Sequence, residues 1–309
     1  MDGILPLWKE PGLTSHDCVF KVRKLLKMKK VGHTGTLDPQ VDGILPICIG
    51  QATKISSIIM ESPKVYEAEI TLGIATETED QEGQIIKKEK VSDTLTIDDI
   101  VQTLSEFEGE IEQTPPMYSA VKVKGKKLYE YARMGVEVER PQRSITIHHL
   151  KLLSESIDWS QDHSTASFRI RVKCSKGTYI RTLCVDIGSA LGYPAHMSQL
   201  TRTESGTFRQ TQSLTIEDLK KAVLEDKIEE NLYSIDFALQ KFDTLYISEQ
   251  DVSRYKHGQV LPLPENMPST DPFRIKAETT NELIALYQIH PSKKDFMKPY
   301  KMFQVPAQT

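Results

Sequence analysis

Asp38 stands in a glycine-rich stretch near the start of the chain, VGHTGTLDPQVDGILP at residues 31–46. Aspartate before proline is ordinary turn chemistry, so a role in a turn is the simplest interpretation. Three chemical roles compete with it: a phosphate-binding loop, a metal ligand and a catalytic carboxylate. Each role requires different companion residues, which must be present elsewhere in the sequence.

The motifs that the first two roles need are missing. GHTGTLDP has neither the spacing nor the lysine of a phosphate-binding P-loop, and no dinucleotide fingerprint G-x-G-x-x-G follows a strand. His33 and Asp38 have no third ligand at a recognised metal-site spacing. His148 and His149 are adjacent in an expected strand, so their side chains should diverge. We therefore expect no cofactor and no metal.

A catalytic carboxylate is the remaining chemical role for Asp38. The hydrolase motif G-x-S-x-G is absent as well. A lone carboxylate must stay ionised and aimed, and an arginine fork is its natural partner. Residue types alone do not select which arginine that is.

Several elements are expected around this loop. Thr14 followed by Asp17 predicts a capped helix to about residue 28, with a basic outer face, and a buried strand is expected over 44–49. KVYEAEITL (64–72) alternates and directs Tyr66 to its apolar side, where a plain core tyrosine is the alternative to a functional one. SFRIRVKC (167–174) alternates with basic residues outward, and a helix is expected over 178–191.

Strands and helices interleave without a regular βαβ period, which favours an α+β fold with a mixed, largely antiparallel sheet and a catalytic cleft. Residues 215–239 look helical. Beyond them lie short strand-like pieces, the last of which is YKMFQV at 300–305. We expect a catalytic domain over 1–240 and a small β-barrel-like domain over 245–309.

Composition indicates an ordinary globular protein. The formal net charge is −4 and the sequence pI is about 6.1, which alone argues mildly against a nucleic-acid partner. The charge is uneven: residues 21–30 carry six basic residues and no acid, whereas residues 77–112 are strongly acidic. The four cysteines form no C-x-x-C pair, and no apolar run reaches the roughly 20 residues of a membrane span. We expect a cytoplasmic protein with no membrane partner.

Six motifs resemble those of the TruB family of pseudouridine synthases, and they follow one another in that family's order. They are KEPGLTSHD, GHTGTLDPQVDGILPICIG, KVYEAEITLG, PPMYSAVKVKGKKLYEYAR, CSKGTYIRTL and AHMSQLTRT, within residues 3–210. In the first motif the order Trp8-Lys9-Glu10-Pro11 departs slightly from the family pattern. The final segment is similar to the PUA domain that many members carry.

The resemblance implies a pseudouridine synthase fold with a PUA-type RNA-binding domain at its C-terminal end. It also implies a reaction, the isomerisation of the uridine at position 55 in the T-loop of tRNA to pseudouridine. Uracil is detached, turned and rejoined through carbon 5, so no cofactor is needed. The target base must be flipped out of a folded loop, which costs about a few kcal/mol.

The resemblance also assigns roles to residues. Asp38 matches the catalytic carboxylate, Arg181 the arginine that pairs with it, and Tyr66 the tyrosine that stacks on the flipped uracil. His33 matches the histidine that fills space near the flipped base. Tyr179, Leu200 and Asp80 match further residues around the uridine pocket.

With RNA as the expected substrate, the basic helix face and the basic strand face become candidate phosphate contacts. These residues are Lys21, Lys24, Arg169, Arg171 and Lys173. The expected partner is the T-arm of tRNA, bound by a monomer without a guide RNA. The alternatives are a non-catalytic RNA-binding or RNA-chaperone protein of the same fold, a guide-dependent relative and, from Asp38 alone, a glycosidase. A glycosidase would need a second carboxylate that is not evident.

Overall fold

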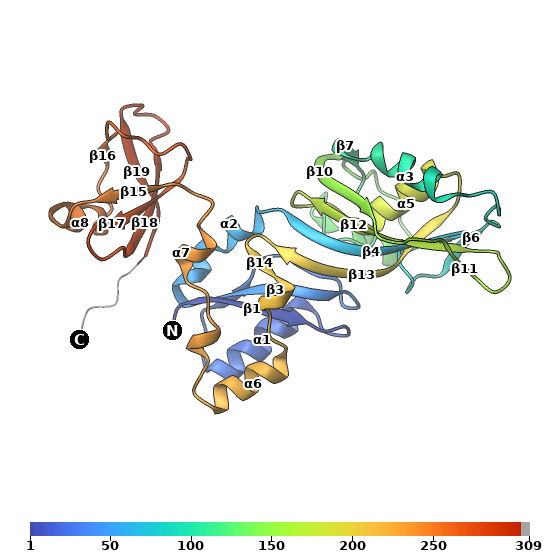
Figure 1. The fold of residues 1–309 in the computed structure, drawn as a ribbon, viewed down its shortest axis with the longest axis horizontal. Helices are drawn as coiled ribbons and strands as arrows, with labels where there is room; N and C mark the ends of the chain where they lie inside the picture. The colour runs from blue at the N-terminus through green and yellow to red at the C-terminus, as the bar shows by residue number, and fades with distance from the viewer. Residues whose placement is uncertain (304–309) are drawn as a thin grey trace.

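The computed structural model describes residues 1–303. The described chain is elongated, with a large sheet running through its centre and a smaller sheet at one end (Figure 1). The large sheet contains β1 (Gly3–Lys9), β2 (Val31–His33), β3 (Asp42–Ile49), β4 (Lys64–Leu72), β7 (Gly109–Gln113), β10 (Arg143–Leu152), β11 (Asp158–Trp159), β12 (Ala166–Cys174), β13 (Ala195–Ser205) and β14 (Phe208–Arg209).

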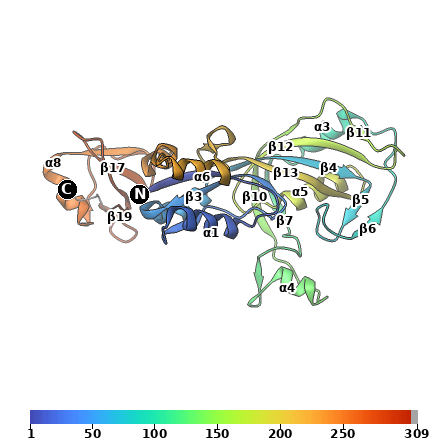
Figure 2. The same ribbon diagram turned by 90° about the horizontal axis from the view of Figure 1, so that it is seen from below.

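Helices and short hairpins surround this sheet. The helices are α1 (Ser15–Leu26), α2 (Ser56–Met60), α3 (Ile97–Ser105), α4 (Leu128–Arg133), α5 (Ile180–Ala190), α6 (Ile216–Leu224), α7 (Ile235–Ala238) and α8 (Glu249–Lys256), with 3-10 turns at Gly50–Ile55, Gln210–Gln212 and Glu229–Asn231. One hairpin pairs β5 (Ile74–Thr76) with β6 (Ile85–Lys88), and another pairs β8 (Lys122–Val123) with β9 (Lys126–Lys127). The second hairpin and α4 project away from the body of the molecule (Figure 2).

The large sheet follows the order β1-β3-β13-β4-β12-β10-β7. Within the described residues its one parallel contact joins β13 to β3, and all its other pairs are antiparallel. The α+β class and the mixed, largely antiparallel sheet expected from the sequence are therefore confirmed.

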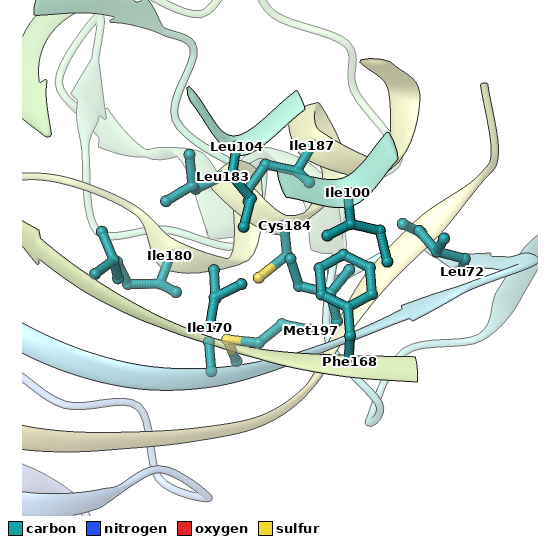
Figure 3. Close-up of a cluster of buried hydrophobic side chains, with 14 of the residues drawn as sticks. Leu72, Ile100, Leu104, Phe168, Ile170, Ile180, Leu183, Cys184, Ile187 and Met197 are labelled. Carbon is teal, nitrogen blue, oxygen red and sulfur yellow. The ribbon is translucent and has the colours of Figure 1, made fainter. Parts of the chain in front are cut away.

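The sheet is buried differently at its two ends. Around β1 and β3 both faces are covered, because Leu45 and Ile47 pack under α1 and α6 whereas Ile44 and Cys48 face the opposite side. This explains why ILPICI reads as a continuous apolar run. At the other end, α3 and α5 cover one face of β4, β12 and β13, and Phe168, Ile170 and Leu183 lie in that core (Figure 3).

Helix α1 begins as its sequence predicts. Thr14 is the N-cap, and it exchanges hydrogen bonds with Asp17 in a capping box.

The expected helical stretch over 215–239 is wrong as one element. Helix α6 ends at Leu224, and Asp226 takes a left-handed φ of 57°, so the chain breaks into α6, a 3-10 turn and α7.

The two adjacent histidines lie at an irregularity of their strand. A β-bulge between Ile147 and His149 interrupts the register of β10, and both His148 and His149 are exposed. Among the residues that the structure describes, no three His, Cys, Asp or Glu side chains gather as metal ligands would.

The smaller sheet is formed by β15 (Thr244–Ile247), β16 (Leu261–Pro262), β17 (Phe273–Ala277), β18 (Leu283–Ile289) and β19 (Phe296–Met302). Ion pairs and apolar contacts hold this sheet against the rest of the chain. Asp236 of α7 accepts from Arg274 and Lys276 of β17, each at 2.9 Å, while Leu286 and Phe303 join the core behind β3. The last expected strand piece extends to residue 305, and residues 304–305 lie outside the described part.

No described helix has the length and apolar character needed to cross a membrane.

Candidate active site

The loop that carries Asp38 joins β2 to β3 and is held at several points. Ser15, at the start of α1, accepts from the Leu37 amide at 2.9 Å. Lys9 is fully buried, and its Nζ donates to Pro39 O at 2.9 Å and to Leu13 O at 2.7 Å. These anchors fix the residues on both sides of Asp38, whereas its own side chain remains 44% exposed. The carboxylate is therefore both held and accessible.

Arg181, in the first turn of α5, meets that carboxylate. Its Nη2 lies 3.0 Å from Asp38 Oδ2, and only 7% of the arginine side chain is exposed. The guanidinium also donates to Thr78 O at 2.9 Å and to Tyr118 O at 3.1 Å. Backbone carbonyls thus orient the fork, and the ion pair is shielded from solvent on the arginine side, which strengthens it.

Two cavities meet at this ion pair. The first is about 670 Å³ and is lined by carboxylates and amides, among them Asp42, Asp80 and Gln199. The second is about 600 Å³ and is lined by tyrosines and cations, among them Tyr66 and Tyr179. Both are bordered by the same five residues, which are Asp38, Val41, Tyr118, Arg181 and Leu200.

Tyr66, Tyr179 and Leu200 come from three different elements to line the second cavity. Tyr66 lies on β4, and Leu200 lies on the neighbouring β13, opposite Ala68. Tyr179 is the residue just before α5. Gln113 fixes its backbone by accepting from its amide at 2.8 Å and donating to its carbonyl at 3.0 Å. Gln113 stands at the end of β7 outside every sequence motif, so no local pattern signals this contact.

Burial sets the protonation of the groups around the second cavity. It raises the pKa of Tyr66, against the opposing effect of the Arg202 charge, so the phenol is neutral near pH 7. Burial lowers the pKa of Lys64 to about 8. Lys64 Nζ donates to carbonyls at the end of α2, including Met60 O and Ser62 O.

Asp80 reaches the site from the loop between β5 and β6. Its Oδ2 lies 3.7 Å from Arg181 Nη1, while its Oδ1 accepts from Thr78 Oγ1 at 2.5 Å. Asp80 therefore lies behind the Asp38–Arg181 pair and lines the first cavity. The neighbouring Glu79 is half-buried, and desolvation raises the pKa of its carboxyl.

His33 is placed apart from these groups. It ends β2, its ring meets the His16 ring edge-on at 5.7 Å, and its Nδ1 accepts from the Gly35 amide. Among the described residues that line the two cavities, His33 is missing. Burial lowers the pKa of its imidazole, so the ring is uncharged near pH 7.

The expected phosphate contacts occupy two surfaces. Lys21 and Lys24 are exposed on α1. Arg169, Arg171 and Lys173 are exposed on β12, on the face of the sheet opposite Tyr66, because Val172 is the register partner of Tyr66. Glu67 lies 3.6 Å from Arg169 and 3.3 Å from Arg171 and offsets part of their charge. Tyr66 and the second cavity lie on the other face.

The sequence and the fold have close relatives. Residues 23–180 match the profile of the TruB family pseudouridylate synthase N-terminal domain, and residues 181–244 match the tRNA pseudouridylate synthase B C-terminal domain. The chain is 51% identical over 306 residues to the tRNA pseudouridine synthase B of Oceanobacillus iheyensis, covering 99% of this chain and 98% of the relative. It is 47% identical over 312 residues to that of Bacillus pumilus, covering all of both chains.

Two solved structures share the architecture. One is a chain of an H/ACA RNP bound to a substrate RNA containing 2′-deoxyuridine, with a TM-score of 0.72 and 27% identity. The other is a chain of a Cbf5–Nop10–Gar1 complex, with a TM-score of 0.71 and 29% identity. In each case the match covers 98% of this chain and 85% of the other.

Proposed function

The chain belongs to the TruB family of pseudouridylate synthases, and we propose that it isomerises the uridine at position 55 in the T-loop of tRNA to pseudouridine. The observation that carries this proposal is the Asp38–Arg181 pair, 3.0 Å apart at the junction of two cavities. A carboxylate held there by a shielded guanidinium can act on a nucleoside that enters either side.

Asp38 is the catalytic carboxylate in this proposal. Breaking the bond between ribose and uracil leaves positive character on the sugar, which a carboxylate captures or stabilises until carbon 5 of the turned base bonds to the ribose. Arg181 holds the Asp38 carboxylate in position through their 3.0 Å contact. Asp80 holds Arg181 from behind at 3.7 Å. The isomerisation gains no atoms and transfers no electrons, so it requires no cofactor.

The second cavity is the proposed uracil pocket. Tyr66 stacks on the flipped base, and Tyr179 and Leu200 complete the walls. Such a pocket replaces stacking that the base loses on leaving the RNA loop, a cost of about a few kcal/mol. His33 lies on the segment that leads to the Asp38 loop. It is proposed to fill the space that the base vacates, work that suits an uncharged ring.

Lys21 and Lys24 are proposed phosphate contacts. They are exposed on α1, the helix that packs against β2, where His33 lies. Arg169, Arg171 and Lys173 remain proposed contacts of a weaker kind, because they face away from the second cavity and two of them share Glu67. We propose residues 1–240 as the catalytic domain and residues 245–309 as a PUA-like RNA-binding domain, of which 304–309 lie outside the described residues.

A stand-alone enzyme that binds tRNA itself, as a monomer in the cytoplasm, is favoured over a guide-dependent one. The relatives named tRNA pseudouridine synthase B are about 50% identical over nearly the whole chain, whereas the chains from guide-type RNPs are 27% and 29% identical. A non-catalytic RNA-binding protein is disfavoured because Asp38, Arg181 and Tyr66 are all present and gathered.

The test is tritium release from a T-arm stem-loop RNA that carries 5-tritiated uridine. Rejoining through carbon 5 expels that tritium, so the wild-type protein should release it and Asp38→Asn should not. Binding of the same RNA to both proteins is the control. Binding without release by the wild type would overturn the enzymatic proposal in favour of an RNA-binding one.

A further inference from the structure

Arg202 is the largest fully buried side chain of the described residues, and it lies beside the proposed uracil pocket. It is 1% exposed and lines the second cavity. Its Nε donates to Ile44 O at 2.8 Å. The two terminal nitrogens have longer contacts, with Nη1 3.5 Å from Thr36 O and Nη2 3.4 Å from Gly35 O. One arginine thus binds β3 and the start of the loop that carries Asp38.

The backbone of Arg202 is inserted between two partners. On β13 it is the register partner of Tyr66 on one side and of Gly43 on the other. Gly43 has a φ of +127°, and a Cβ there would lie 2.4 Å from Arg202 O. Only glycine permits this approach. Gly43, in the motif that also carries Asp38, is therefore needed because it admits Arg202, a reason that the sequence alone did not reveal.

The guanidinium lacks an acidic partner. Arg181 has Asp38 and Asp80 within 4 Å, but among residues 1–303 no carboxylate lies that close to Arg202. A buried charge without a counter-charge is costly unless hydrogen bonds satisfy it. Two of the three carbonyl contacts are long, so the terminal N–H groups have capacity left. Arg202 and Tyr66 line the same cavity from neighbouring strands, where they are register partners, so the Tyr66 hydroxyl is an acceptor within the surroundings of this guanidinium.

We propose that Arg202 is a positioning residue that ties the Tyr66 hydroxyl to the Gly35–Thr36 segment and fixes the direction of its hydrogen bonds. This inference rests on the proposed function. Arginine has donors only, so the Tyr66 oxygen must accept from it. The phenol proton then points away from Arg202, into the cavity shared with Asp38. Tyr66 is thereby presented to the substrate both as a flat ring and as a donor of fixed direction.

Several charged or titratable groups face Tyr66, and the inference concerns one of them. They are Arg202 from β13, Cys174 from β12, Lys64 from β4 itself, Asp38 from the β2–β3 loop and Arg181 from α5. Arg202 is the group among these to which the proposal assigns the hydrogen bond to the hydroxyl, and its positive charge favours the ionised phenol. Removing its charge should therefore make the phenol harder to ionise, while the other groups stay in place.

The experiment compares Arg202→Gln and Arg202→Lys, each with Tyr66 intact and with Tyr66→Phe. Single-turnover tritium release is measured at saturating RNA. With Tyr66 intact, Arg202→Gln should slow release about 30-fold and Arg202→Lys less. In the Tyr66→Phe background the same change should cost about 3-fold or less, because the two residues act as a unit. Equal losses in both backgrounds, or a loss confined to RNA affinity, would overturn the inference and assign Arg202 to a substrate phosphate.

A second measurement does not depend on activity. The absorbance titration of Tyr66, taken as the difference from Tyr66→Phe, should move to higher pH in Arg202→Gln and by less in Arg202→Lys. The matched control is Arg274→Gln, which removes another inward-facing arginine, bound to Asp236 and Phe242 O. It should lower the melting temperature and leave the Tyr66 titration unchanged.

An unshifted titration in a folded Arg202→Gln protein would overturn the inference. If that variant does not fold, Arg202→Lys serves for the same titration. Wild-type tritium release separates the two proposals, since its absence overturns the proposed function, whereas normal release with an unshifted Tyr66 titration overturns only the role of Arg202.

Discussion

Thr182 Oγ1 donates a 2.6 Å hydrogen bond to the carboxylate of Glu79. The residue before it, Arg181, donates at 2.9 Å to the carbonyl of the residue before Glu79, Thr78. Two consecutive residues of α5 therefore hold two consecutive residues of the β5–β6 loop, which also carries Asp80. Glu79 has a left-handed φ of 65°, which a residue with a side chain adopts at a cost unless its surroundings hold it there. This double contact holds the β5–β6 loop against α5 and keeps Thr78 O in place as an acceptor for the Arg181 guanidinium.

Replacing Thr182 by valine should therefore impair turnover more than binding. Valine keeps the shape but removes the donor to Glu79, so the loop behind Arg181 loosens. We expect about a 3- to 10-fold lower kcat, which corresponds to roughly 1 kcal/mol, with little change in KM for the T-arm RNA. Thr182→Ser restores the hydroxyl and should recover most of the loss. A kcat equal to wild type in Thr182→Val would show that the contact does not position Arg181.

Removing the guanidinium itself should have a far larger effect. Arg181→Ala leaves Asp38 without its partner and leaves Thr78 O and Tyr118 O without their donor. Loss of a preorganised charge partner in an active site costs about 100- to 1,000-fold in turnover. Much of the RNA affinity should survive, because the proposed phosphate contacts lie on α1 and β12 and not at this ion pair. Tritium release and RNA binding measured on one preparation test this, and unchanged release would refute the pairing.

His33→Ala should be milder than any change at Asp38. The ring lies outside both cavities and its proposed task is to fill space in the RNA, so its loss should slow release by about 10-fold through weaker capture of the flipped state. Asp38→Asn should abolish release altogether. The two variants are compared under single-turnover conditions. A total loss in His33→Ala would assign that residue to the chemistry.

Gly43→Ala should destabilise the fold. Its Cβ would meet Arg202 O at 2.4 Å and Arg202 N at 2.5 Å in a conformation, φ of +127°, that alanine resists. We expect a loss of about 2–4 kcal/mol in the free energy of unfolding, measured by urea denaturation. Gly32→Ala is the matched control, because no atom lies within 4 Å of a Cβ there. Equal stability of the two variants would contradict the close approach.

Asp186 should make stability depend on pH. Burial, followed by the nearby Glu79 charge, raises its pKa to about 6. The folded state therefore holds a proton that the unfolded chain releases above its ordinary pKa of about 4, so this contribution to stability is complete below pH 4 and is lost as the pH rises to 6. Asp186→Asn should remove this loss and be more stable than wild type at pH 7, by about 1 kcal/mol after allowance for partial exposure. Thermal melts at pH 4 and pH 7 test this, and an equal effect at both would contradict it.

Features that depend on residues close together in the chain were predicted correctly from the sequence. Thr14 and Asp17 form the capping box that their spacing predicts, and the strand expected over 64–72 is β4 with the same limits. Continuous motifs also identified the family. These features depend on residues close together in the chain, so the residue types nearly suffice.

Tertiary structure decided which distant residues meet. Asp38 and Arg181 are 143 positions apart, and their 3.0 Å contact requires the β2–β3 loop to be held by Lys9 and Ser15 and α5 to be packed across β4 and β12. Gln113, Glu79 and Arg202 carry no local pattern, because their contacts depend on backbone groups brought together by the sheet. The sequence determined the candidate chemical groups, and only the fold decided their geometry, because hydrogen bonds and charges act over a few ångströms of space and not along the chain.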